Sequence, residues 1–89
     1  MLITIETSKN FDKKFRKLAK KLQLQAKSRI LIFMEQPFNP QLNNHSLHGD
    51  KKFARSINIS GDVRILYVEV DDTTVRFLDI DTHHNLYGS

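Results

Sequence analysis

The sequence predicts an α+β fold in the order β-α-α-β-β-β, with a mostly antiparallel sheet of about four strands and an N-terminal helical hairpin packed on one face of it. Two observations support this prediction. Apolar residues recur with helical spacing in the first half of the chain, and they alternate with polar residues, as in strands, in the second half. With 89 residues, 39% of them hydrophobic, we expect one domain spanning residues 1–89.

The first half begins with a short strand, because apolar and polar residues alternate over residues 2–6. Ser8 then has a side chain suited to a helix N-cap. The apolar residues that follow lie on one face of a helix of about four turns: Phe11, Phe15, Leu18, Ala19 and Leu22. A second apolar group repeats this pattern before Pro37 and predicts the second helix: Ala26, Ile30, Leu31, Phe33 and Met34.

Residues 36–46 are loop-like, and after them apolar residues recur at every second position. Residues 53–60 alternate, and their first face consists of Phe53, Arg55, Ile57 and Ile59. A tight turn at SGD leads to a nearly continuous apolar strand over residues 63–70, and DDT leads to a third strand over residues 74–80. Helices packed on one face of such a sheet leave the other face open to solvent or a ligand.

Charge is unevenly distributed along the chain. The net charge is +4, yet residues 9–29 contain nine of the fourteen Lys and Arg residues and only one acidic residue, Asp12. A basic segment of this kind is typical of a surface that binds a polyanion or an acidic protein, and equally of a solvated helix face.

The composition also narrows the protein class. No cysteine is present, which excludes disulfides and thiolate metal sites. No segment approaches the roughly 20 apolar residues that span a membrane, and the start of the chain does not have the pattern of a secretion signal. We therefore expect a soluble cytoplasmic protein that contacts no membrane.

Residues able to do chemistry are concentrated in the second half of the chain. In chain order they are His45, His48, Arg55, Asp62, Arg64, Arg76, His83 and Tyr87. These side chains could converge on the open face of the sheet. Histidine can act as a base or an acid near neutral pH, arginine binds phosphate, and an aromatic ring can stack on a nucleobase. Such a set suits cleavage of RNA without a metal, in which the ribose 2′-hydroxyl attacks its own phosphate.

Each candidate also has a purely structural interpretation. Surface positions are the better interpretation of His48 and His84, and Tyr87 could pack the end of the chain onto the sheet. Asp62 in SGD is a common turn residue. The strand arginines could pair with nearby acidic residues. The histidine spacing fits no zinc motif, so we expect no metal and no cofactor.

Three motifs and the strand between them give the second half a recognisable pattern: NHSLHG at residues 44–49, RSINISGD at 55–62, and THHNLY at 82–87. Residues 43–88 resemble the carboxyl half of the RelE/ParE-superfamily toxins, and most closely the YafQ branch of bacterial type II toxin-antitoxin modules. The resemblance implies a RelE-like fold. It also implies a ribosome-dependent endoribonuclease that cleaves mRNA in the ribosomal A site and is neutralised by a cognate antitoxin.

The resemblance implies roles for individual residues. His45 and His83 match positions of acid/base work, Asp62 matches an acidic position in the hairpin turn, and Tyr87 matches an aromatic that supports the site. We expect these four to be catalytic. We expect contacts with RNA or phosphate from seven basic residues: Arg55, Arg64, Arg76, Lys51, Lys52, Lys13 and Lys17.

The chain departs from this family pattern at four positions. Asn58 replaces a histidine, Val63 a tryptophan, Asp79 the arginine of the site, and Asp81 a glycine. An acidic group beside a dianionic transition state is unfavourable, so a strand arginine has to supply the cation or the enzyme is weak. Two alternatives follow: an inhibitor of DNA gyrase, as on the ParE side of the superfamily, or an RNA- or ribosome-binding homologue without catalysis.

Overall fold

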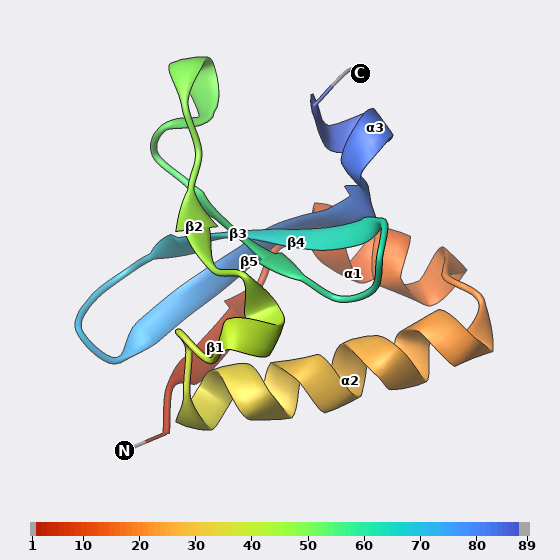
Figure 1. Cartoon of the computed structure of the whole chain (residues 1–89), viewed down its shortest axis with the longest axis horizontal. Helices are drawn as coiled ribbons and strands as arrows, with labels where there is room; N and C mark the ends of the chain where they lie inside the picture. The colour runs from red at the N-terminus through yellow and green to blue at the C-terminus, as the bar shows by residue number, and fades with distance from the viewer. Residues whose placement is uncertain (1, 88–89) are drawn as a thin grey trace.

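The computed structural model describes residues 2–87, and its central sheet has α1 and α2 on one face and α3 on the other (Figure 1). The elements are β1 (Thr4–Thr7), α1 (Lys9–Lys17), α2 (Lys20–Glu35), the 3₁₀ turn η1 (Pro40–Leu42), β2 (His45–Ser46), the 3₁₀ turn η2 (Gly49–Lys51), β3 (Arg55–Asn58), β4 (Val63–Glu69), β5 (Thr74–Thr82) and α3 (His83–Tyr87). No helix within this part of the chain is long and apolar enough to cross a membrane.

The sheet has the strand order β1-β5-β4-β3-β2. Only the β1–β5 pair is parallel among the described strands, so the predicted element order and mostly antiparallel sheet are confirmed. The sheet has five strands instead of about four, because β2 arises within the segment that the sequence predicts to be a loop. Two residues are too few for a period of two to be visible in a sequence.

The core lies between the sheet and the two N-terminal helices. Side chains alternate between the two faces of each strand, and this alternation directs Ile57, Ile65 and Tyr67 into the core. Phe33 of α2 packs against the ring of Tyr67, with 4.9 Å between ring centroids, and against Phe77, with 5.8 Å. The strand residues that alternate with these core residues, such as Leu66 between Ile65 and Tyr67, therefore lie on the opposite face, where α3 lies.

A β-bulge at Leu78 reverses the alternation along β5. Tyr67 pairs with Phe77, but its neighbour Leu66 pairs with Asp79, so Leu78 is the extra residue. The Leu78 carbonyl accepts hydrogen bonds from the start of α1, at 2.9 Å from the hydroxyl of Ser8. Because of the bulge, Ile80 returns to the core, and Asp79 and Asp81 lie on the face opposite α2.

The predicted first helix of about four turns is wrong in its length. Ser8 does cap the helix, since its hydroxyl accepts from the Phe11 amide at 3.0 Å, but the helix ends at Lys17. Leu18 and Ala19 are extended, with ψ near 147° and 146°, and α2 begins immediately after them. No glycine or proline marks this break in the sequence.

The side chain of Gln23 explains why the break is stable. Its amide donates to the carbonyls of Phe15, Arg16 and Leu18 at 3.0, 3.3 and 3.2 Å. These carbonyls lie at the C-terminal end of α1, where helical partners are missing. A residue in α2 therefore supplies the cap for α1, which a propensity-based prediction cannot detect.

We expect Gln23→Ala to lower the free energy of unfolding by about 1 to 2 kcal/mol, because the half-buried carbonyls at the end of α1 lose their donor. Urea unfolding followed by circular dichroism measures this change. Gln25→Ala is the matched control, since the described part of the chain gives the side chain of Gln25 no hydrogen bond, and we expect a change below about 0.5 kcal/mol. Equal losses in both variants would refute the capping role.

Candidate active site

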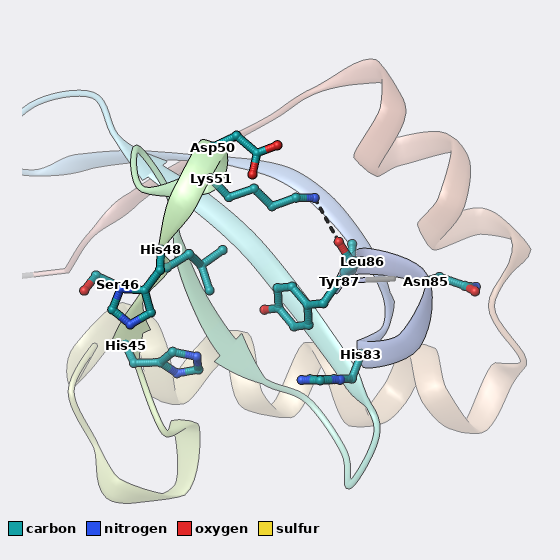
Figure 2. A pocket seen from close by; sticks show the side chains of 10 residues that line it. His45, Ser46, His48, Asp50, Lys51, His83, Asn85, Leu86 and Tyr87 are labelled. Carbon is teal, nitrogen blue, oxygen red and sulfur yellow. Dashed lines mark hydrogen bonds between the residues drawn. The ribbon is translucent and has the colours of Figure 1, made fainter. Parts of the chain in front are cut away.

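A cleft of about 630 Å³ opens between the β2–η2 segment and α3 (Figure 2). Both segments extend from the side of the sheet opposite α2 (Figure 1). The side chains that line the cleft are His45, Ser46, Leu47, His48, Asp50, Lys51, His83, Asn85, Leu86 and Tyr87. Its two walls come from segments about 35 residues apart in the chain, as in the pair Lys51 and Leu86. Folding therefore brings together two of the motifs that the sequence predicts to be functional.

The first wall is the short helix α3. The hydroxyl of Thr82 accepts from the Asn85 amide at 3.1 Å, and the His83 amide donates to the Asp62 carbonyl at 2.8 Å. The buried side chain of Leu86 anchors the helix. His83 and Tyr87 then lie one helical turn apart, with ring centroids 4.4 Å apart and planes at 66°, and both rings line the cleft.

The second wall contains His45 on β2. Its Nδ1 lies 2.7 Å from the carbonyl oxygen of Asn43. Because a carbonyl can only accept, Nδ1 carries the hydrogen, and Nε2 of the neutral ring keeps its lone pair. The rings of His45 and His83 point toward each other across the cleft (Figure 2). The cleft thus offers one nitrogen able to accept a proton and a second imidazole facing it.

A lysine connects the two walls. Nζ of Lys51, at the end of η2, donates to the Leu86 carbonyl in α3 at 2.8 Å (Figure 2). Lys51 is the only lysine or arginine among the ten lining residues, and its side chain is partly buried. A cation in this position can stabilise negative charge that develops within the cleft.

Two of the three strand arginines have structural partners outside the cleft. The guanidinium of Arg64 donates to the carbonyls of Ser60, Gly61 and Val63 at 3.0 to 3.2 Å and so holds the β3–β4 turn. Arg76 pairs with Glu6 of β1 at 2.8 Å on an exposed part of the sheet. Neither side chain lines the cleft, and their predicted contacts with RNA stay predictions.

Arg55 belongs to a separate polar network and does not line the cleft. Its Nε donates to Oδ1 of Asn44 at 2.8 Å, and its guanidinium lies 5.1 Å from the ring centroid of Phe38. The amide of Asn44 donates to the Tyr67 hydroxyl at 2.7 Å. Burial raises the pKa of Tyr67, against the opposing effect of this hydrogen bond. Arg55 therefore supports the loop that leads into β2, next to His45.

The other predicted residues do not line the cleft. Asp62 has an exposed side chain, and only its backbone carbonyl contacts the site, through the His83 amide. Lys52 is exposed beside η2, and Lys13 and Lys17 are exposed on α1. The structure thus groups His45, Lys51, His83 and Tyr87 in one cleft and places the remaining predicted residues outside it.

Six of the ten lining residues are not among the predicted site residues: Ser46, Leu47, His48, Asp50, Asn85 and Leu86. His48 is exposed, as the sequence predicts, and it also lines the cleft, three positions after His45. The signal was the NHSLHG motif itself, because both of its histidines lie in the same short wall. Asn85 carries no sequence signal, and only the geometry of α3 reveals it.

The acidic departures Asp79 and Asp81 are paired with a lysine of α1. Nζ of Lys14 lies 2.8 Å from Oδ1 of Asp79 and 3.2 Å from Oδ2 of Asp81. The hydrogen bond to Asp79 raises the pKa of Lys14, against the opposing effect of partial burial. Burial alone would raise the pKa of Asp81, but hydrogen bonds from Asn85, the Thr82 amide and Lys14 outweigh it and lower this pKa.

Between residues 2 and 87, no group of three or more His, Cys, Asp or Glu side chains is arranged to hold a metal ion.

Comparisons with known proteins show the family and the fold of this chain. The family described as the bacterial toxin of type II toxin-antitoxin system, YafQ, matches residues 3–88. The crystal structure of YafQ from E. coli strain BL21(DE3) superimposes with a TM-score of 0.77 and 25% identity, covering 97% of this chain and 99% of that chain. A chain of the E. coli DinJ-YafQ toxin-antitoxin complex gives a TM-score of 0.75 and 26% identity, covering 99% and 100%.

More distant structures share the fold alone. A chain of the archaeal RelE-RelB complex from Pyrococcus horikoshii OT3 gives a TM-score of 0.72 at 19% identity, covering 92% of this chain and 96% of that chain. The predicted RelE-like fold is therefore confirmed. A sequence comparison with curated proteins finds no match.

Proposed function

This chain belongs to the YafQ family of bacterial toxins of type II toxin-antitoxin systems, and from that premise we propose that it is a ribosome-dependent endoribonuclease that cleaves mRNA by acid-base catalysis without a metal. The observation that supports this most directly is that His45 and His83 face each other across one cleft that Lys51 also lines. RNA cleavage by the 2′-hydroxyl needs a base, an acid and a cation, and these three side chains can supply them.

In the proposed reaction the ribose 2′-hydroxyl loses its proton to Nε2 of His45 and attacks the adjacent phosphorus. A bond forms between phosphorus and the 2′-oxygen while the bond to the 5′-oxygen breaks, which leaves a 2′,3′-cyclic phosphate. His83, protonated at the start, donates a proton to the departing 5′-oxygen. Lys51 stabilises the extra negative charge on the phosphate oxygens in the transition state.

Tyr87 and Asp62 act on this reaction through His83. The Tyr87 hydroxyl is buried and has no hydrogen-bond partner among residues 2–87, and the ring of Tyr87 is the part that contacts His83. The edge-to-face contact at 4.4 Å holds the His83 ring in one orientation. The Asp62 carbonyl fixes the His83 backbone. We therefore assign orienting roles to these two residues.

Exposed basic residues outside the cleft are suited to binding RNA and an antitoxin. Exposed lysines on α1, such as Lys13 and Lys17, and Lys52 beside the cleft would bind ribosomal RNA electrostatically, with a strong dependence on salt. The E. coli YafQ to which this chain is similar was crystallised in a complex with DinJ. We propose a cognate antitoxin for this chain, whose acidic or amphipathic segment covers the same basic surface.

The test is expression in bacteria from a tightly controlled promoter, with the 5′ ends of ribosome-bound mRNA mapped after induction. We expect growth arrest together with new mRNA ends at sites within translated codons. Growth arrest with intact mRNA, accompanied by inhibition of DNA supercoiling by the purified protein, would favour the gyrase-inhibitor alternative. Binding to ribosomes with intact mRNA and no inhibition of supercoiling would favour a homologue without catalysis.

We expect Lys51→Met to lower the rate of mRNA cleavage by about 10²-fold, since removal of one group that stabilises the transition-state charge typically costs this much. Single-turnover cleavage on programmed ribosomes measures the rate. Lys52→Met is the matched control, because it removes the same charge from the next, exposed position outside the cleft. Equal losses in the two variants would show that Lys51 contributes only general electrostatic binding.

A further inference from the structure

The helix that carries His83 is too short to hold itself in place. α3 has five residues, and an isolated helix of this length is unstable in water. Its position therefore depends on contacts with the rest of the chain. Three anchors are described above: Leu86, which is buried, the bond from Lys51 to the Leu86 carbonyl, and the bond from the His83 amide to Asp62.

A fourth anchor lies at the start of the helix, on the carboxylate of Asp81. Oδ1 accepts from the Thr82 amide at 2.8 Å and from Nδ2 of Asn85 at 2.9 Å, while Oδ2 accepts from Nζ of Lys14 at 3.2 Å. The backbone amide of Asn85 also donates to the hydroxyl of Thr82. One carboxylate thus connects the first turn of α3 to β5 and to α1.

Lys14 makes this arrangement electrostatically possible. Asp79 and Asp81 lie on the same face of β5, so without a cation between them their charges repel. The ion pairs are partly shielded from water, since the side chains of Lys14, Asp79 and Asp81 are 35%, 24% and 26% exposed. Other lysines of α1, such as Lys13, are exposed.

We propose that Lys14 and Asp81 are positioning residues of the cleft: together they hold α3, and with it the rings of His83 and Tyr87, in the geometry that the reaction needs. The two acidic residues that depart from the family pattern then have a structural task, and their charge is compensated from α1 and does not act unopposed on the transition state. The effect on catalysis rests on the proposed function, whereas the effect on the ring geometry does not.

The test uses four variants of the full chain. Lys14→Gln and Asp81→Asn break the ion pair, and Asn at position 81 keeps the shape but turns one acceptor into a donor that faces Lys14 or Asn85. Lys14→Arg keeps the charge and is the conservative rescue. Lys27→Gln is the matched control, because it removes the same charge from an exposed position of α2 that lies outside the cleft and has no assigned contact with RNA.

The first readout is NMR of the aromatic side chains, because the ring of Tyr87 at 4.4 Å shifts the signals of His83. We expect Lys14→Gln and Asp81→Asn to move the His83 and Tyr87 signals and to leave the core ring signals of Phe33 and Phe77 in place. The spectra of Lys14→Arg and Lys27→Gln should resemble that of the wild type. Unmoved His83 and Tyr87 signals in both Lys14→Gln and Asp81→Asn would overturn the proposal.

The second readout is single-turnover cleavage of mRNA as the ribosome concentration is varied. Misplacement of a catalytic group by about 1 Å can cost about 10²-fold, so we expect the maximal rate of Lys14→Gln and Asp81→Asn to fall by about 10- to 100-fold. The ribosome concentration that gives the half-maximal rate should change as little as in Lys27→Gln. A loss confined to that concentration would overturn the role in catalysis. No cleavage by the wild type would refute the proposed function, whereas moved ring signals would still support the positioning role.

Discussion

His83→Gln is expected to lower the maximal rate of mRNA cleavage by about 10²- to 10⁴-fold, the range typical for loss of a general acid or base. His83 lines the cleft opposite His45 and belongs to the wall formed by α3. Glutamine keeps a polar side chain of similar reach but does not titrate near neutral pH, so it cannot give up a proton to the leaving oxygen. Single-turnover cleavage on programmed ribosomes measures this rate.

The neighbouring histidine provides the control for this experiment. His84 is exposed and does not line the cleft, so we expect His84→Gln to cleave within about threefold of the wild-type rate, as is usual for surface substitutions. The two variants have the same composition and net charge. A rate for His83→Gln that equals the rate for His84→Gln would remove His83 from the reaction, and the growth arrest would then need another cause.

Phe33→Ala is expected to lower the free energy of unfolding by about 3 to 5 kcal/mol, because truncation of a buried aromatic side chain leaves a cavity that the core cannot refill. Phe33 is 0% exposed and packs against Tyr67 and Phe77. Phe53→Ala makes the same chemical change at a side chain that is 65% exposed, and we expect it to cost less than about 1 kcal/mol. Urea unfolding followed by circular dichroism measures both.

A loss of this size is a large part of the stability of a small domain, which is about 5 to 15 kcal/mol. Phe33→Leu is therefore included, since it keeps most of the buried volume and should cost clearly less than Phe33→Ala. If Phe33→Ala and Phe53→Ala unfolded at the same urea concentration, the core would not be centred on α2 as described.

The element order of the fold was predictable from local sequence, because helices and strands bury one face and so impose periods that a short window reveals. The structural details that the local sequence did not predict have nonlocal causes. The break at Leu18 and Ala19 is stabilised by Gln23 from the next helix, and no residue at the break itself marks it. The bulge at Leu78 is visible only in the register between β4 and β5. It changes the face on which Asp79 and Asp81 lie, and so it affects the site directly.

The sequence by itself determined the fold class and the residue types of the cleft, since His45 and His83 lie in short motifs that can be read without knowing their neighbours. The tertiary structure alone decided which basic side chain lies in the cleft and which one pairs with the acidic residues beside it. Lys51 reaches the cleft because η2 faces α3, whereas Arg55, Arg64 and Arg76 have other partners. Lys14 pairs with Asp81 across 67 positions of the chain. Charge pairing depends on distance in space, and sequence periodicity carries no information about contacts between segments that far apart.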